Sequence, residues 1–186
     1  SVICTGAREI FHDINIIPSP ILSGVALPAP DEDSCIIQTS RGCDNNCYYC
    51  PLGKRFEFCR YFNIDRVISE VQYLSNLNLS SVRINDSDFL SDEDRFQLLA
   101  NKLGKIKNKP KFSALIRYEK LTIENIEYLR KMNVTNVSVG LQTIHKSLLN
   151  KMERKFEKED FKTKLRDLKN SGIKPSVDLL LGIPGD

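Results

Sequence analysis

Residues 34–50 read SCIIQTSRGCDNNCYYC and join a short run of β-forming residues to a loop rich in cysteine. The run from Cys35 to Thr39 predicts a strand, and after the loop apolar residues recur at helical spacing from Ile64 to Leu74. This stretch therefore predicts the order strand, loop, helix, which is the repeating unit of parallel α/β folds.

The same unit repeats along the rest of the chain. Further strands are predicted at 82–84, 112–116, 134–139 and 177–181, and helices are predicted to start at Ser91 and Thr122. The charged stretch 148–168 forms either one kinked helix or two, ended by Gly172. About five parallel strands with right-handed crossovers predict an α/β fold, a partial (β/α) barrel whose C-terminal units are missing, because a complete barrel needs about 250 residues.

The domain organisation follows from length and composition. At 186 residues the chain is long enough for one domain with its own core. Residues 1–33 hold four of the eight prolines and an acidic run, so they predict an N-terminal arm or linker from an upstream domain. Residues 34–186 are then the core domain.

Charge and hydropathy exclude several classes of protein. No apolar run is long enough to cross a bilayer, and the N-terminus lacks a secretory signal, so we expect a cytoplasmic protein without a membrane partner. A net charge of +3 is too small to argue for nucleic-acid binding. The basic segments 102–111 and 151–169 are interpreted as solvated helix faces.

Three cysteines, Cys43, Cys47 and Cys50, have the spacing C-x3-C-x2-C. Three thiolates on one loop suit three irons of a four-iron cluster and leave the fourth iron without a protein ligand. The alternative is a zinc-stabilised binding module without catalysis, because a structural zinc needs four ligands and Cys35 or Cys59 is available as the fourth.

This segment resembles the signature of the radical S-adenosylmethionine (radical SAM) superfamily, including the aromatic Tyr49 directly before the third cysteine. The similarity spans about residues 35–186 and extends to three further stretches, Thr39–Gly42, Ser138–Gln142 and Leu181–Gly185. Most similar are members with a cobalamin-binding domain ahead of the barrel, where an Ile-Pro-Ser-Pro stretch such as Ile17–Pro20 links the two.

The resemblance implies a [4Fe-4S] cluster whose open iron holds the amino and carboxylate groups of S-adenosylmethionine. One electron, from a donor such as flavodoxin or ferredoxin, cleaves it to methionine and a 5′-deoxyadenosyl radical, which takes hydrogen from a substrate that the sequence does not identify. Cobalamin-dependent chemistry competes with cobalamin-free hydrogen abstraction. A cobalamin ligand would have to come from upstream of Ser1, because no Asp-x-His-x-x-Gly stretch occurs here.

Candidate ligands of the cofactor follow the strands, where parallel α/β folds collect their ligands. Asp86 and Asp88 stand where the family commonly has a Gly-Gly-Glu that contacts the methionine amino group, and each is otherwise a turn-forming aspartate. Arg117 is a candidate for pairing with the methionine carboxylate, or else a surface arginine.

The last two strand exits supply the remaining candidates. Gln142 is a candidate partner of the ribose hydroxyls, with Gly140 allowing close approach, and the alternative is a solvated amide beside a turn glycine. Asp178 is either a polar or catalytic group facing the cavity or a member of a buried hydrogen-bonded pair. Near the adenine the resemblance places three residues that otherwise form a loop: Gly182, Pro184 and Gly185.

Overall fold

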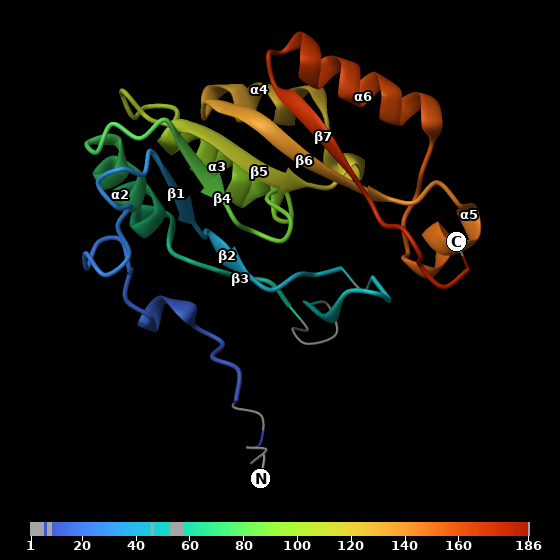
Figure 1. Ribbon diagram of the computed structural model, residues 1–186, viewed down its shortest axis with the longest axis horizontal. Helices are drawn as coiled ribbons and strands as arrows, with labels where there is room; N and C mark the ends of the chain where they lie inside the picture. The colour runs from blue at the N-terminus through green and yellow to red at the C-terminus, as the bar shows by residue number, and fades with distance from the viewer. Residues whose placement is uncertain (1–5, 7–8, 46, 53–57, 186) are drawn as a thin grey trace.

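The computed structural model describes residues 6, 9–45, 47–52 and 58–185. Its centre is a parallel sheet of five strands in the order β1-β4-β5-β6-β7 (Figure 1). The strands are β1 (Ser34–Ile37), β4 (Ser81–Ile84), β5 (Lys111–Ile116), β6 (Val134–Gln142) and β7 (Lys174–Leu179). The α/β fold class and the five parallel strands are as predicted, and the arrangement is that of a partial (β/α) barrel.

Helices cover one face of this sheet (Figure 1). They are α2 (Ile64–Ser75), α3 (Glu93–Leu103), α4 (Ile123–Lys131) and α6 (Lys158–Asn170), while the short helix α5 (Lys146–Lys151) follows β6. The main core lies between helices and sheet: on β4, Val82 and Ile84 are buried and the intervening Arg83 is exposed. The strands therefore alternate apolar and polar residues, as expected for a sheet with one covered face.

Several element boundaries differ from the prediction, and two of the differences have a clear physical reason. The fifth strand runs over 174–179 rather than 177–181, and it admits Pro175 because β7 is the last strand of the order in the described sheet. Helix α3 is capped by Asp92, whose carboxylate accepts the N–H of Arg95, and not by Ser91. The charged stretch forms two helices, α5 and α6.

The N-terminal arm lies against the domain where the structure describes it. Its short 3-10 helix η1 (Ile14–Ile16) buries Ile14, and Ile21 is buried in the same core. Arg66 of α2 donates to the carbonyl oxygen of Ile17 at 2.5 Å. The origin of the arm in an upstream domain stays a prediction.

A two-stranded hairpin that the sequence pattern did not predict flanks the cysteine loop. Strand β2 (Ser40–Arg41) pairs antiparallel with β3 (Arg60–Tyr61). Strands of two residues have no period to detect. In the described part of the chain, no helix combines the length and the apolar character needed to cross a membrane.

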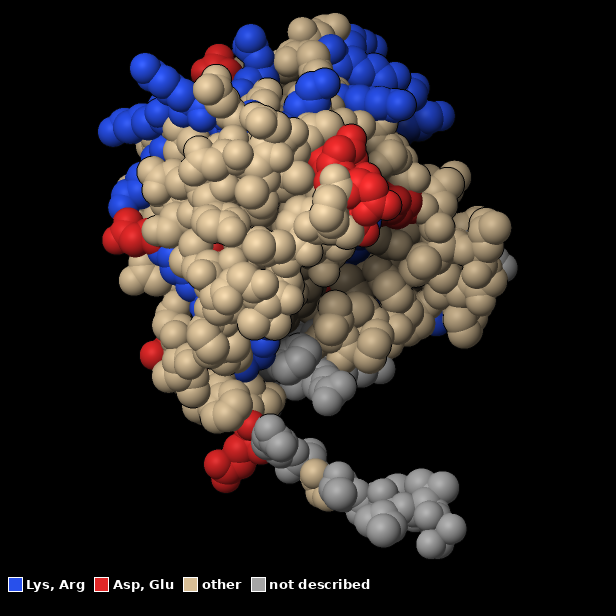
Figure 2. All heavy atoms as spheres, turned by 60° about the vertical axis from the view of Figure 1, so that its left-hand side comes forward, with Lys and Arg blue, Asp and Glu red and all other residues tan. Residues whose placement is uncertain are grey.

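Many basic side chains lie over α4 and α6 on the face that Figure 2 shows. Figure 2 shows Lys and Arg gathered at the top, the level at which Figure 1 places α4 and α6. On α6, Lys158, Lys162 and Lys169 are exposed. This exposure agrees with the interpretation of the charged stretch as a solvated helix face, with the exception of Arg154, described below.

Candidate functional site

The cysteine loop leaves the carboxyl end of β1 through β2 and carries three free thiols. Cys43, Cys47 and Cys50 are all half-buried. The backbone N–H of Cys50 donates to the carbonyl oxygen of Cys47 at 2.9 Å, so these two cysteines share a turn. The Asn45 amide donates to Cys43 Sγ at 3.3 Å. All three thiols therefore belong to one loop at the edge of the sheet where ligands collect.

The base of the loop is a close approach of two backbone segments. Gly42 has φ +104°, and a Cβ there would lie 2.5 Å from the carbonyl oxygen of Phe58. Beside it, the backbone N–H of Cys59 donates to Asp44 Oδ1 at 2.7 Å. The hairpin thus holds the loop directly before its first cysteine, and only glycine fits at this position.

Gly42→Ala is expected to destabilise the protein well beyond the strain of a positive φ alone. Gly24→Ala is the matched control, since Gly24 has φ +74° but no heavy atom within 4 Å of a Cβ. The control should cost about 1 kcal/mol of unfolding free energy, measured by anaerobic urea denaturation. Equal costs for the two variants would show that the contact with Phe58 does not constrain the loop.

Aromatic side chains of the cysteine loop pack against the C-terminal part of the chain. The rings of Tyr48 and Tyr49 meet edge to face with centroids 5.9 Å apart. Both pack on a small apolar cluster formed by Leu148, Met152 and Ile183. Burial raises the pKa of Tyr49, which stays protonated. The predicted cofactor residue Tyr49 therefore connects the cysteines to the exit of β7.

A partly buried ion-pair network, in which Arg154 is the buried member, lies behind the loop. Arg154 Nε and Nη2 donate to Glu119 Oε1 and Oε2 at 2.8 and 3.0 Å, and Nη2 also donates to the Gly140 carbonyl oxygen at 2.6 Å. Arg117 Nη2 donates to Glu119 Oε1 at 3.1 Å, while its buried Nε has no hydrogen-bond partner among the described residues. Burial alone would raise the pKa of Glu119, but the hydrogen bond and charge of Arg154 outweigh it and the pKa is lowered.

This network acts on the thiol of Cys47. Burial raises the pKa of Cys47, and the positive charges of Arg154 and Arg117 oppose that shift. Arg154 is 6% exposed. Arg154 falls in a charge-rich stretch, so the residue pattern did not single it out; the available signal was its position between the apolar Met152 and Phe156. The interpretation of the whole stretch as a solvated face is wrong for this residue.

Asp86 is buried, and its carboxylate already accepts hydrogen bonds from other groups of the chain. It accepts the backbone N–H groups of Thr39 and Ser40 at 2.7 and 3.1 Å and the hydroxyl of Thr39. Burial raises the pKa of Asp86, and the hydrogen bonds from Thr39 and Ser40 oppose the rise. In this geometry Asp86 anchors the connection from β1 to β2. Its role as a ligand of an amino group stays a prediction.

Asp88 is also buried, in the turn that leads to α3. Its Oδ1 accepts the backbone N–H of Leu90 at 3.2 Å, and Oδ2 lies 3.8 Å from Lys120 Nζ. Burial raises the pKa of Asp88 and Lys120 opposes the rise. These contacts fit the turn-forming alternative, and the ligand role is a prediction that no contact tests.

The exits of β6 and β7 bring three predicted residues together. Gly140 and Asp178 are register partners, and Ser138 donates to Asp178 Oδ2 at 2.6 Å. Asp178 thus belongs to a half-buried hydrogen-bonded pair. Gln142 has φ +73°, and a Cβ on Gly140 would lie 2.7 Å from its side-chain nitrogen. A side chain at position 140 would therefore displace the carboxamide of Gln142 from this position.

The loop after β7 contains the remaining predicted residues. Gly182 and Gly185 have φ of +76° and +97°, and Pro184 is exposed. Ile183 between them is buried against Leu148 and Met152. One side chain thus anchors this loop beside the tyrosines, and its backbone stays accessible.

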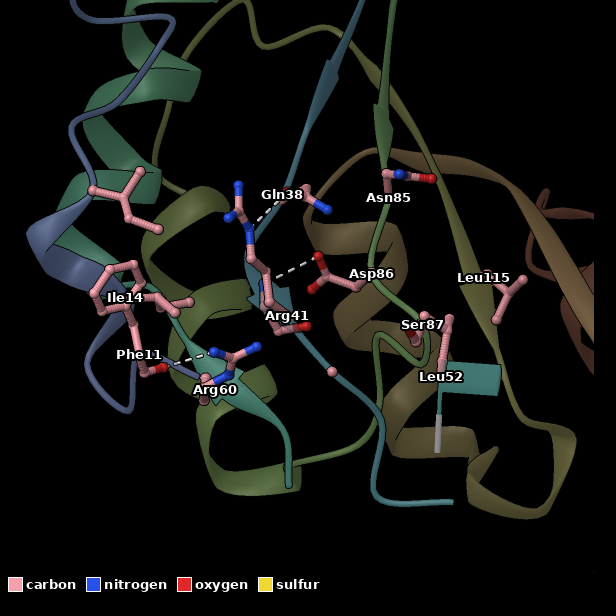
Figure 3. A pocket seen from close by; sticks show the side chains of 13 residues that line it. Phe11, Ile14, Gln38, Arg41, Leu52, Arg60, Asn85, Asp86, Ser87 and Leu115 are labelled. Carbon is pink, nitrogen blue, oxygen red and sulfur yellow. Dashed lines mark hydrogen bonds between the residues drawn. The ribbon is translucent and has the colours of Figure 1, made fainter. Parts of the chain in front are cut away.

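A cavity of about 560 Å³ opens beside the cysteine loop, between the N-terminal arm and the ends of β1 and β4 (Figure 3). Gly42 and Leu52, which flank the cysteines, line it. At its rim, Arg41 Nε donates to Gln38 Oε1 at 3.2 Å, and Arg60 Nη1 donates to the carbonyl oxygen of Phe11 at 2.6 Å (Figure 3). The cavity has an apolar wall on the arm and polar groups on the strands.

The donor set fits an iron–sulfur cluster. Cluster ligation places each thiolate on a separate iron, so the three cysteines of one loop need not converge on a single point. Within the described ranges, no three His, Cys, Asp or Glu side chains are grouped as ligands of one metal ion. The cations near Cys47 favour the thiolate form that binds iron.

Comparison with known proteins relates most of the chain to one family and to larger enzymes. The family model described as the Radical SAM superfamily matches residues 37–186. The ribosomal protein uS12 methylthiotransferase RimO of Clostridium novyi (strain NT) is 26% identical over 161 residues, which cover 81% of this chain and 36% of that protein. The tRNA-2-methylthio-N(6)-dimethylallyladenosine synthase of Finegoldia magna is 27% identical over 158 residues, 78% of this chain and 34% of that protein. The chain spans about a third of these relatives.

Solved structures share the fold at low identity. The radical S-adenosylmethionine methyltransferase TsrM from Kitasatospora setae, with tryptophan and a SAM analogue bound, aligns with a TM-score of 0.76 at 20% identity, covering 83% of this chain and 31% of that chain. The cobalamin-dependent S-adenosylmethionine radical enzyme OxsB aligns with a TM-score of 0.71 at 17% identity. The alignment covers 94% of this chain and 28% of that chain. At these identities the likeness concerns the fold.

Proposed function

The chain belongs to the radical SAM superfamily, and we propose that it is the catalytic core of an enzyme that cleaves S-adenosylmethionine reductively to start a radical reaction. The observation that carries the proposal is the position of Cys43, Cys47 and Cys50 on one loop at the carboxyl ends of parallel strands, beside the cations Arg117 and Arg154. When bound, a [4Fe-4S] cluster would supply the electron that splits S-adenosylmethionine into methionine and a 5′-deoxyadenosyl radical.

The residues of the chain bind and orient the cofactors in this proposal. The three thiolates hold the cluster, and the Gly42 contact with the hairpin sets the start of their loop. Arg117 Nε is buried without a hydrogen-bond partner in the described part of the chain, so Arg117 is proposed as the donor for the methionine carboxylate. Glu119 orients both arginines through its two carboxylate oxygens.

The β6 and β7 exits supply the nucleoside part of the site. The carboxamide of Gln142 and the accessible backbone around Gly182, Pro184 and Gly185 are proposed to contact ribose and adenine. Asp178, held by Ser138, faces the same end of the sheet. The cavity beside the cysteine loop and the adjoining cavity on the sheet, which share Leu115, are proposed to admit the substrate, whose hydrogen is abstracted.

Cobalamin-dependent methyl transfer in a longer protein is a second candidate. One observation favours it: the fold is shared with the methyltransferase TsrM and the cobalamin-dependent enzyme OxsB. Methylthio transfer, named for the two curated relatives, competes with it. Product analysis with an upstream domain present distinguishes these reactions.

Anaerobic reconstitution tests the proposed function. Protein reconstituted with iron and sulfide should hold a [4Fe-4S] cluster and, with S-adenosylmethionine and dithionite, release methionine and 5′-deoxyadenosine. Iron, sulfide and zinc analysis and chromatography of the nucleoside are the measurements. One zinc per chain with no iron-dependent cleavage would instead support the zinc-stabilised binding module.

A further inference from the structure

The face of the sheet turned away from α2, α3, α4 and α6, called here the open face, carries a row of polar side chains. The register pairs Arg83 of β4 with Ser113 of β5, Ser113 with Asn136 of β6, and Asn136 with Lys174 of β7; on the β1 side Arg83 pairs with the exposed apolar residue Ile36. Register partners in a parallel sheet point to the same side. On β4, the neighbours of Arg83 in the chain are buried toward the helices, so this whole row lies on the open face.

The next row toward the carboxyl ends is also largely polar. It pairs Leu115 with Ser138 and Ser138 with Ser176. A cavity of about 220 Å³ spans both rows, lined by Arg83, Ser113, Leu115, Asn136, Ser138 and Ser176 among others. Bulky branched apolar residues ordinarily fill the inner face of a (β/α) barrel. Hydroxyl, amide and guanidinium groups at these positions indicate a hydrated ligand-binding face.

The charges of the open face are unbalanced. Arg83 is exposed and forms no hydrogen bond or ion pair with a described residue. Lys111 and Lys174 share its face through the register. Among the described strand residues, the carboxylate on this face is Asp178, which already accepts from Ser138. The electrostatic complement of such a face is an anion.

We propose that the open face binds an oxyanion of the substrate, a phosphate or a carboxylate, with Arg83 as its main donor. The guanidinium offers two parallel N–H groups to such a group, the Ser113 hydroxyl lies next to it in the register, and the Asn136 amide follows on the next strand. The inference rests on the proposed function, since the bound molecule is the one whose hydrogen is abstracted.

The test measures oxyanion binding by NMR on the cluster-reconstituted chain without reductant. Inorganic phosphate and acetate are titrated separately, and the arginine side-chain and backbone N–H signals are followed. The wild type should show saturable shifts at Arg83, Ser113 and Asn136. Arg83→Gln should bind at least tenfold more weakly and Arg83→Lys should bind with intermediate affinity. Arg130→Gln is the control, because Arg130 is an exposed residue of α4 on the other side of the sheet, and this variant should bind as the wild type does.

The two titrations identify the source of the anion, and both positive results support the proposal. Tighter binding of phosphate points to a phosphorylated substrate, and equal or tighter binding of acetate points to a carboxylate. Absence of saturable shifts at the open face, or equal weakening by Arg130→Gln, overturns it. The measurement needs no S-adenosylmethionine cleavage, so its failure is distinct from failure of the proposed function.

Discussion

Cys47→Ala is expected to lower the iron content of the reconstituted protein and to reduce S-adenosylmethionine cleavage to the background of the reductant alone. Cys47 is the middle ligand of the proposed set and shares its turn with Cys50. Two thiolates on the loop are too few to hold a four-iron cluster whose fourth iron has no protein ligand. Iron and sulfide analysis, the visible absorbance and the 5′-deoxyadenosine yield are the measurements.

Cys59→Ala is the matched control for this experiment. Cys59 is a half-buried free thiol whose Sγ lies 4.0 Å from the Gly42 carbonyl oxygen, so it adjoins the loop without belonging to the motif. The cluster and the cleavage should survive this substitution. Loss of a stoichiometric zinc in Cys59→Ala, or retained cleavage in Cys47→Ala, contradicts the ligand assignment.

Arg154→Met is expected to destabilise the protein by about 3 kcal/mol and to impair cluster incorporation. Methionine keeps much of the side-chain length but leaves the carboxylate of Glu119 without its bidentate partner, and breaking a buried pair costs about 3–5 kcal/mol. The Glu119 side chain is 20% exposed, which favours the lower end of that range. Removing the cation also raises the pKa of Cys47 further. Urea unfolding under anaerobic conditions measures the stability.

Two comparisons test the origin of this loss. The double variant Arg154→Met, Glu119→Gln should recover part of the stability, because it removes the unpaired charge. Lys162→Met breaks the surface pair with Glu159 and should change the stability little. The lowered pKa of Glu119 means that the pair stabilises above its ordinary pKa and ceases to do so as pH falls through the lowered value. A loss from Arg154→Met as small as that from Lys162→Met would show that the network is not structural.

How far the sequence predicts the site differs from residue to residue. The three cysteines and Tyr49 are legible because their spacing is local, and the structure places them on one loop. Asp86 was selected for its place after a strand, but hydrogen bonds to Thr39 and Ser40, more than forty residues earlier, occupy its carboxylate. Arg154 was missed for the converse reason: a charged residue in a charged stretch gives no sign that its partner is Glu119, thirty-five residues away.

The sequence alone determined the order of strands and helices, the parallel sheet and the cysteine motif. These features depend on hydrophobic periodicity and residue spacing, which can be read within a short window of the sequence. Tertiary packing decided which carboxylates are engaged internally, which arginine is buried behind Cys47, and that Arg83 stands in a polar row beside Ser113 and Asn136. Those properties depend on register and burial. Both arise only when segments distant in the chain are brought together. The residue pattern of one strand distinguishes its two faces, but it does not show which neighbouring strands or helices pack against them.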